Sequence, residues 1–246
     1  ELARNPANKD SSWEIKFDAT AFYPAGGWAI LNVRHIESGN DGWTQLRLFL
    51  LAPPTITPPT SVVDINARIT GTGHTGLHLN SVDVFLDPLT DKIGGGWVNQ
   101  TTGAWFADVS LPAGRIGITA NQLYSEKSSE KAAVVYFNVR PPQLSEFTVS
   151  YEGGKTILSG TRYKDVAIYI HITYGARTEF LVDVGSGDWR IEVPATYLPQ
   201  QSSYTSMQKI GNGGTGWIDS EWSTSQLVVV KPRKLTLNAP SLSGQT

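Results

Sequence analysis

The stretch Gly187-Asp188-Trp189-Arg190-Ile191-Glu192-Val193 contains a turn signal, a tryptophan and then apolar side chains at every second position. Such alternation places the apolar side chains on one face of a β-strand. Two earlier stretches have the same arrangement, residues 11–17 around Trp13 and residues 103–109 around Trp105. The three tryptophans are separated by roughly 84 to 92 positions, a spacing that suits one small domain per unit. The sequence therefore predicts a tandem repeat with one tryptophan-bearing strand in each unit.

A second motif repeats with a similar spacing. Ile69-Thr70-Gly71-Thr72 corresponds to Leu158-Ser159-Gly160-Thr161, and Leu242-Ser243-Gly244 starts the motif once more. Each tryptophan strand is followed by an alternating stretch, a polar loop, a last apolar strand and a closing proline. The alternating stretches are residues 28–36, 116–123 and 204–210. The last apolar strands are residues 46–51, 133–139 and 227–230. The closing prolines are Pro53-Pro54, Pro141-Pro142 and Pro232. Because several motifs share one period, the repeat is not a chance match.

Strand signals recur roughly every 8 to 12 residues within a unit, separated by turn-forming residues, as in β-sandwiches. No stretch combines a helical period with helix-capping signals. Alternation implies one buried and one solvated face, which two packed antiparallel sheets provide. We therefore predict an all-β fold of tandem antiparallel β-sandwich domains with the repeated tryptophan in the core. The proline pairs predict short, stiff linkers between the domains, because proline fixes φ and donates no hydrogen bond.

The repeated features resemble the bacterial immunoglobulin-like, or fibronectin-III-like, repeats of large secreted or surface proteins. The matching features are the (Ile/Leu)-(Thr/Ser)-Gly-Thr start, the Gly-x-Trp strand, a proline-containing turn and a valine-rich closing strand, over most of residues 53–232. The resemblance implies tandem Ig-like sandwiches, roles in cell-surface adhesion, as a stalk or as a toxin accessory, and no catalysis.

The repeat predicts the domain boundaries. Residues 1–52 match the C-terminal half of an Ig-like domain, residues 53–140 and 141–232 each match a whole one, and residues 233–246 match a linker and the first strand of a following repeat. We expect the chain to be a piece of a larger protein. The first strands of the half domain then lie upstream, come from another chain that pairs with residues 1–52, or are dispensed with. A fragment of residues 1–52 that folded alone would contradict strand pairing with another chain.

Composition narrows the possible partners and location. The formal net charge of −2 argues against nucleic acid, which requires a concentrated basic surface. No run of 18 apolar residues is present, so the sequence predicts no membrane-spanning segment. The chain has no cysteine, which fits large exported bacterial repeat proteins. We expect an extracellular or cell-surface location and a partner that is a protein or a glycan on a cell surface.

Residue patterns for metal ions and cofactors are weak. His74 and His78 are four positions apart in a glycine-rich loop, whereas that spacing suits zinc only on a helix. Asp83, Asp87 and Asp91 surround a predicted strand and turn without the spacing of a calcium loop. We predict loop histidines and solvated carboxylates, with no metal site and no cofactor.

The sequence also lacks a catalytic pattern. No Gly-x-Ser-x-Gly sequence is present, and candidate acids and nucleophiles are scattered over different units. The run Gly94-Gly95-Gly96 is predicted to be a turn before Trp97 and not a phosphate-binding loop. The sequence therefore predicts that this chain is not an enzyme.

Trp97 and Trp217 are the candidate ligand-binding residues. Both adjoin glycine clusters and are predicted to lie in loops, where an exposed tryptophan can stack on a sugar or insert into a partner pocket. The alternative is packing against the domain that carries each tryptophan.

Three functions remain open at this point. The first is a non-catalytic spacer or adhesion segment of a large bacterial surface or secreted protein, such as an adhesin or a toxin-associated protein. The second is a carbohydrate-binding module appended to a secreted enzyme, which requires two or three coplanar aromatic rings on one exposed face. The third is an accessory domain of a toxin or secretion assembly, and the sequence does not separate it from the first.

Overall fold

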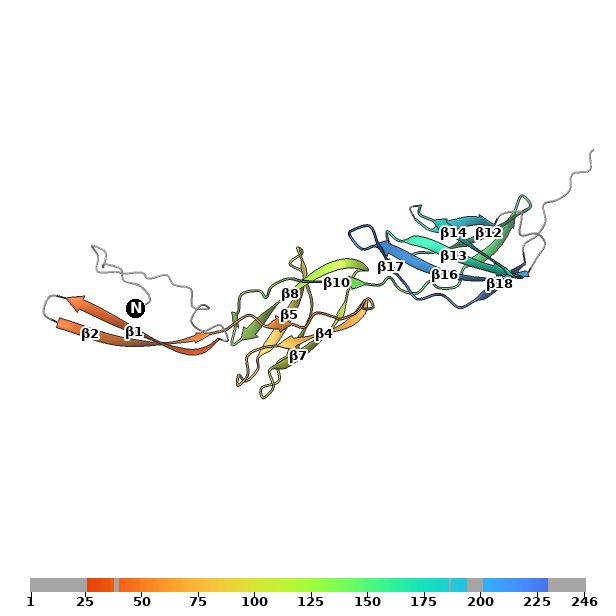
Figure 1. The fold of residues 1–246 in the computed structure, drawn as a ribbon. Coiled ribbons are helices and arrows are strands. Elements are labelled where there is room, and N and C mark those ends of the chain that lie inside the picture. The colour runs from red at the N-terminus through yellow and green to blue at the C-terminus, as the bar shows by residue number, and fades with distance from the viewer. Residues whose placement is uncertain (1–25, 38–39, 186, 194–200, 230–246) are drawn as a thin grey trace, which may run out of the picture. The chain divides into compact units, whose positions relative to one another are not determined.

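A computed structural model describes residues 26–37, 40–185, 187–193 and 201–229, and these form β-strands and connecting segments (Figure 1). All strand pairs in the described ranges are antiparallel, apart from one isolated parallel bridge. None of these residues forms a helix long and apolar enough to cross a membrane. The predicted all-β fold of antiparallel sheets is confirmed.

The N-terminal part of the described chain is a long hairpin of β1 (Gly27–Glu37) and β2 (Asn40–Leu50). Alternate positions of β1 and β2 give one face lined by Ala29, Leu31, Leu46 and Leu48. Trp28 lies on the opposite face and is largely exposed. The predicted strands at residues 28–36 and 46–51 thus pair with each other. The predicted strand around Trp13 lies outside the described residues.

The first sandwich follows the hairpin and has two sheets. One sheet has the order β3-β4-β7, and the other has the order β10-β8-β5-β6, with β9 beside β8. The strands are β3 (Thr55–Ile56), β4 (Asn66–Thr72), β5 (Ser81–Asp87), β6 (Lys92–Trp97), β7 (Ala104–Ser110), β8 (Gly114–Tyr124), β9 (Lys127–Ser128) and β10 (Val135–Val139).

The second sandwich repeats this arrangement. One sheet has the order β11-β12-β15, and the other has the order β14-β13-β16-β17, with β18 also beside β16. In both sandwiches the first, second and fifth strands of the domain form one sheet and the others form the second, which is an Ig-like arrangement. The strands are β11 (Thr148–Glu152), β12 (Lys155–Gly160), β13 (Ala167–Tyr174), β14 (Arg177–Asp183), β15 (Trp189–Val193), β16 (Gln201–Gly211), β17 (Trp217–Asp219) and β18 (Gln226–Val229).

The chain divides into two compact units. The first contains Glu1–Thr60, Asn66–Leu111 and Ile116–Phe137, and the second contains Ser61–Ile65, Pro112–Arg115 and Asn138–Thr246. Two short segments from the middle of the chain therefore belong with the second unit. The tandem Ig-like architecture is confirmed by the sheet order within each sandwich.

In each sandwich the tryptophan of one repeated motif packs against the glycine of the other. Trp105 and Trp189 are 2% and 1% exposed, and they lie opposite Gly71 and Gly160 on the neighbouring strands. A Cβ at Gly71 would lie 2.7 Å from Trp105 Cε2, and one at Gly160 would lie 2.9 Å from Trp189 Nε1. The glycine is needed because the indole occupies the space where a side chain would stand. The prediction that the repeated tryptophan fills the core is confirmed in both sandwiches.

A buried glutamine is a further repeated feature, which the sequence motifs did not reveal. Gln122 Oε1 accepts a hydrogen bond from His74 N at 2.9 Å, and Gln208 Oε1 accepts one from Tyr163 N at 2.7 Å. Both glutamines are fully or almost fully buried, on β8 and β16 respectively. Each therefore satisfies a backbone donor of the loop after the glycine motif, which would otherwise be costly to bury.

The glycine run at residues 94–96 differs from its prediction, because it lies inside β6 and not in a turn. A Cβ at Gly96 would lie 1.8 Å from the Phe106 carbonyl oxygen, and one at Gly94 would lie 2.7 Å from Val109 Cγ1. The backbone of β6 therefore lies directly against β7, and only glycine permits that approach. Because β6 and β7 belong to different sheets, the two sheets of the first sandwich meet along this side, which we call the closed side.

Candidate functional site

The two predicted ligand-binding tryptophans lie at strand ends and not within loops. Trp97 is the last residue of β6, opposite Ser81, and Trp217 is the first residue of β17, opposite Gly211. Their exposed fractions are 67% and 56%. Trp97 belongs to the first unit and Trp217 to the second.

A loop fixed by an asparagine adjoins each of these tryptophans. Asn99 Oδ1 accepts hydrogen bonds from Thr101 N and Thr102 N at 3.0 and 2.9 Å. Asn212 Oδ1 likewise accepts hydrogen bonds from Gly214 N and Gly216 N at 3.0 and 3.2 Å. Such turns are held by their own side chain, so an adjacent aromatic ring loses little freedom on binding.

The predicted loop histidines do not converge. His74 Nδ1 lies 2.7 Å from the Thr75 carbonyl oxygen, and its ring stacks on Phe49 at a centroid distance of 5.5 Å. His78 is exposed in the turn that follows. Within the described ranges, no three His, Asp or Glu side chains are grouped so that they could hold a metal ion.

The acidic residues around β5 have partners from the same sandwich. Asp83 Oδ1 lies 2.7 Å from Lys92 Nζ, and Asp87 Oδ2 accepts a hydrogen bond from the Tyr136 hydroxyl at 3.1 Å. Asp91 lies at the turn before β6. The Asp83 and Asp87 carboxylates are therefore engaged by other side chains, and the three acids do not form a metal-binding group.

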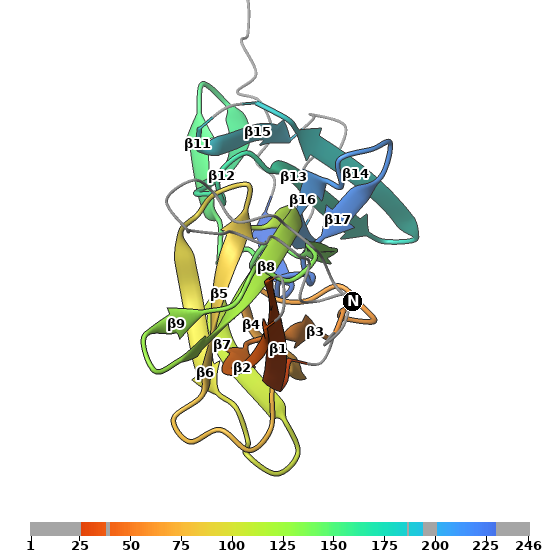
Figure 2. The same ribbon diagram turned by 90° about the vertical axis from the view of Figure 1, so that its left-hand side faces the viewer.

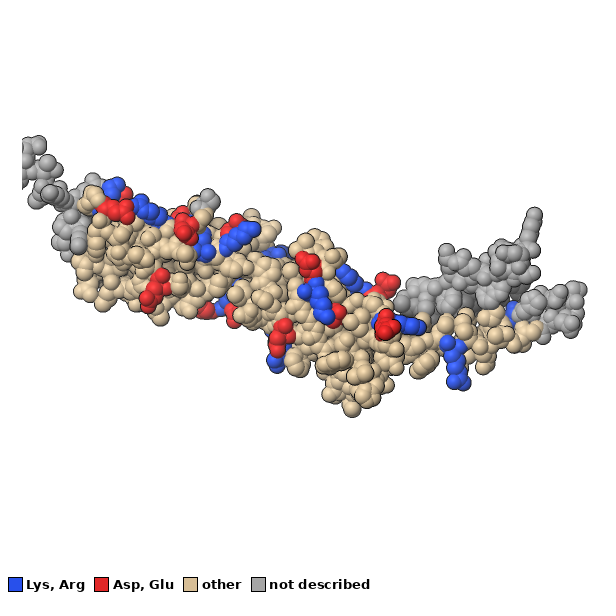
Figure 3. Space-filling model, turned by 180° about the vertical axis from the view of Figure 1, so that it is seen from behind, with Lys and Arg blue, Asp and Glu red and all other residues tan. Residues whose placement is uncertain are grey.

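The surface charge is balanced, as the face in Figure 3 shows, where basic and acidic residues are interspersed. Arg68 and Asp108 illustrate the pattern: the guanidinium donates two hydrogen bonds to the carboxylate, at 2.8 and 2.9 Å. This pairing lowers the pKa of Asp108 and raises that of Arg68. Burial raises the pKa of the Tyr204 hydroxyl to about 12, so this core group stays neutral at physiological pH.

An aromatic patch lies on the outward face of the sheet that contains β13 and β14 in the second unit. We define the aromatic patch as Tyr169, His171, Phe180, Val182 and Trp222. The Phe180 ring lies 5.0 Å from Tyr169 and 4.8 Å from His171, and the Trp222 ring lies 5.8 Å from His171. Phe180 and Val182 are 50% and 52% exposed. Contiguous apolar surface of this kind marks interaction sites more often than isolated exposed residues do.

The rings of the aromatic patch are not coplanar. Phe180 stacks on His171 with an interplanar angle of 17°, so the two rings cover each other. Trp222 is inclined by 65° to Tyr169 and by 56° to His171. A flat platform for a sugar ring is therefore absent from this patch, which suits an apolar protein partner better. Sequence analysis missed the patch because its members come from β13, β14 and the loop after β17.

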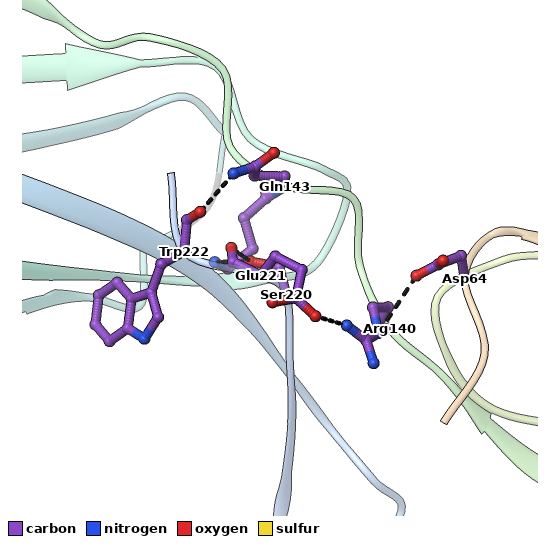
Figure 4. A network of polar contacts seen from close by, with 7 residues as sticks. Asp64, Arg140, Gln143, Ser220, Glu221 and Trp222 are labelled. Carbon is purple, nitrogen blue, oxygen red and sulfur yellow. Dashed lines mark hydrogen bonds and ion pairs between the residues drawn. The ribbon is translucent and has the colours of Figure 1, made fainter. Parts of the chain in front are cut away.

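A polar network surrounds the proline pair Pro141-Pro142 within the second unit (Figure 4). Arg140 forms ion pairs with Asp64, at 3.3 Å, and with Glu221. Gln143 Nε2 donates a hydrogen bond to the Trp222 carbonyl.

Backbone carbonyls near the proline pair are engaged as well. Gln208 Nε2 donates a hydrogen bond to the Pro142 carbonyl at 2.8 Å. Arg140 N donates to the Val63 carbonyl at the same distance, 2.8 Å. Residues on both sides of the proline pair are therefore anchored, which adds to the intrinsic stiffness of proline.

A buried ion pair holds the loops of the second sandwich. Arg162 is 5% exposed and donates to Asp183 Oδ2 at 2.9 Å and to the Gly185 carbonyl at 2.7 Å. Asp183 also accepts hydrogen bonds from the backbone of Gly185 and Arg190. The pair thus connects the loop before β13, the end of β14 and β15, and it has a structural role.

Comparisons with known proteins found no matching family model and no matching curated protein. A two-domain fibronectin type-III segment from chicken tenascin is similar at a TM-score of 0.42 and 10% identity, covering 72% of this chain and 97% of that one. The FN1–FN3 domains of chicken CNTN1 are similar at 0.37 and 9% identity, covering 73% and 66%. The BSP domain of a biofilm associated protein is similar at 0.26 and 14% identity, covering 73% and 30%. The fold assignment rests on the strand order of the two sandwiches.

Proposed function

We propose that this chain is a non-catalytic spacer and adhesion segment of a large bacterial surface or secreted protein, located outside the cell. The observation that carries the proposal is the succession of two sandwiches with the same strand order and a separate tryptophan-centred core in each. Each core can resist unfolding by itself, which suits a segment that bears load. The domain boundaries at residues 52, 140 and 232 are part of the proposal.

The linker chemistry supports the spacer role. Pro141-Pro142 cannot extend a ladder of hydrogen bonds, and Arg140 and Gln143 on either side are anchored by side-chain contacts. The Asp83 and Asp183 carboxylates are paired with Lys92 and Arg162 and are not assembled around an open site. These features favour a mechanical and adhesive role over a catalytic one.

Stretching single molecules of the full chain by its two ends should give two separate unfolding events for the two whole sandwiches. Each event should lengthen the chain by roughly 280 Å, because about 90 residues at about 3.5 Å each replace one short folded domain. The measurement is the gain in contour length by atomic-force spectroscopy. A single event that releases both sandwiches together would contradict the proposed independent spacers.

We further propose that Trp97 and Trp217 contact the partner, a glycan or a protein on a cell surface. Screening the chain against arrays of both classes should find a ligand whose affinity falls about 10-fold or more in Trp97→Ala or Trp217→Ala, as for an aromatic anchor. Trp43→Ala is the matched control, because Trp43 is 63% exposed on β2. Binding that is equal in all four proteins would exclude both tryptophans as contacts.

The β1–β2 hairpin is proposed to pair with a strand of another chain. A two-stranded hairpin is marginally stable alone, and this one has an apolar face at Leu31, Leu46 and Leu48. Among the described residues each strand of the hairpin has only the other as its neighbour, and a third strand would satisfy backbone groups at the hairpin's edge, as in β-augmentation. The fragment of residues 1–52 provides the test: independent folding would remove the reason for a partner strand.

A further inference from the structure

The strand β14 forms an outer edge of the second sandwich. Among the described residues it pairs only with β13, and Figure 2 shows it at the margin of its sheet. Its end is tied to β15 through Asp183, which accepts a hydrogen bond from Arg190 N at 3.2 Å. An edge strand of this kind presents backbone donors and acceptors that a further strand can satisfy.

The equivalent strand of the first sandwich is protected. There, β6 lies directly against β7 through Gly94 and Gly96, as their close approaches to Val109 and Phe106 show. In contrast, Arg177–Asp183 contains no glycine that would permit such an approach and no proline, and its three charged residues, Arg177, Glu179 and Asp183, are each held in an ion pair within the chain. The two sandwiches share one topology but differ at this edge.

We propose that two copies of this chain associate through their β14 strands, paired antiparallel about a two-fold axis at Phe180. Antiparallel edge pairing is two-fold symmetric, as is usual in homodimers. In this register Phe180 lies opposite its own copy, and Arg177 lies opposite Asp183 of the second copy. Thr178 then lies opposite Val182 of the second copy, on the same outward face as the aromatic pair.

The sequence of β14 selects this register. An axis at Glu179 would place two carboxylates opposite each other, and an axis at Leu181 would place Glu179 opposite Asp183 of the second copy. Like charges directly opposite destabilise a sheet, whereas aromatic and opposite-charge pairs stabilise it. An axis at Thr178 would also place opposite charges together, Arg177 and Glu179, but it would pair only three residues of β14. The axis at Phe180, the middle residue of the seven in β14, pairs the whole strand, while Arg177 and Asp183 keep their contacts with Glu179 and Arg162 of their own chain.

The aromatic patch extends the contact beyond the backbone. Phe180 and Val182 point outward beside Tyr169, His171 and Trp222, so the two patches would adjoin across the axis. Their mutual shielding removes apolar surface from water, which favours association. This inference goes beyond the proposed function, because a spacer does not require self-association.

The test is sedimentation of the full chain from about 1 μM to about 1 mM, the range in which small interfaces associate. The wild-type chain should form a dimer of twice the monomer mass. Phe180→Lys and Phe180→Glu should each weaken the dimer by more than about 10-fold, because like charges meet at the axis. An equimolar mixture of the two variants should associate again, because only an axis at this position places residue 180 opposite itself.

Phe106→Lys is the matched control, because Phe106 is a strand residue that is 52% exposed and lies on the closed side of the first sandwich. It should leave the dimer unchanged. Thermal melts should show that both Phe180 variants fold, since half of that side chain is already in water. A monomeric wild-type chain at the highest concentration, an unaffected Phe180→Lys dimer, or a mixture that stays monomeric would each overturn the proposal.

Discussion

Replacing Trp189 with alanine is expected to lower the free energy of unfolding of the second sandwich by about 3–5 kcal/mol. The indole is 1% exposed and packs edge-on against Phe147 at 6.1 Å, in a cluster that includes Leu158 and Tyr204. Its removal leaves a cavity that the surrounding strands cannot fill completely. Because a domain of this size is stable by only about 5–15 kcal/mol, the loss is a large part of the total.

Urea denaturation followed by fluorescence and circular dichroism measures this effect. Trp105 has the equivalent position in the first sandwich. Trp105→Ala should therefore lower the free energy of unfolding of the first sandwich by a similar amount. Trp217→Ala should change neither by more than about 0.5 kcal/mol, because its side chain is 56% exposed. If Trp189→Ala moved both transitions equally, the two cores would be coupled and the independence of the repeats would be wrong.

The second large effect is expected from Arg162→Ala, which should cost about 3–5 kcal/mol. The substitution leaves the Asp183 carboxylate, 19% exposed, without its cation. It also removes the donors to the Val166 and Gly185 carbonyls. The measurement is again the transition of the second sandwich in urea.

Two variants test the mechanism of this loss. Arg162→Lys keeps the charge but cannot reproduce the forked donor geometry, so it should recover only part of the stability. Arg68→Ala removes the exposed ion pair with Asp108 and should have no measurable effect, because water screens that pair. Equal losses from Arg162→Ala and Arg68→Ala would show that burial is not the source of the effect.

The repeat in the sequence predicted the sandwiches because its signals are local. The strand around Trp105 and the strand around Trp189 both lie where the alternation placed them, and both tryptophans fill cores. The glycine run at residues 94–96 was predicted wrongly as a turn. Glycine serves turns and close backbone approaches equally well, and only the position of β7 shows which applies here.

The candidate site could be predicted only in part. Trp97 and Trp217 are exposed, as their glycine-rich neighbourhoods indicated, but their role in binding stays a prediction. The aromatic patch was not foreseen, because Tyr169, Phe180 and Trp222 become neighbours only when β13 and β14 pair and the loop after β17 folds over them. Domain boundaries at residues 52, 140 and 232 also stay predictions.

The sequence by itself determined the strand class and the tandem repeat, and it predicts stiff proline linkers. Side-chain alternation and proline geometry act between residues one or two positions apart, so they can be read without the fold. Only the tertiary structure decided that Gln122 and Gln208 satisfy loop donors and that Arg162 pairs with Asp183. It also decided that β6 lies against β7, whereas β14 pairs only with β13 within the described part of the chain. Those outcomes depend on contacts between strands distant in sequence, and the local pattern of a strand does not specify which neighbour its edge will meet.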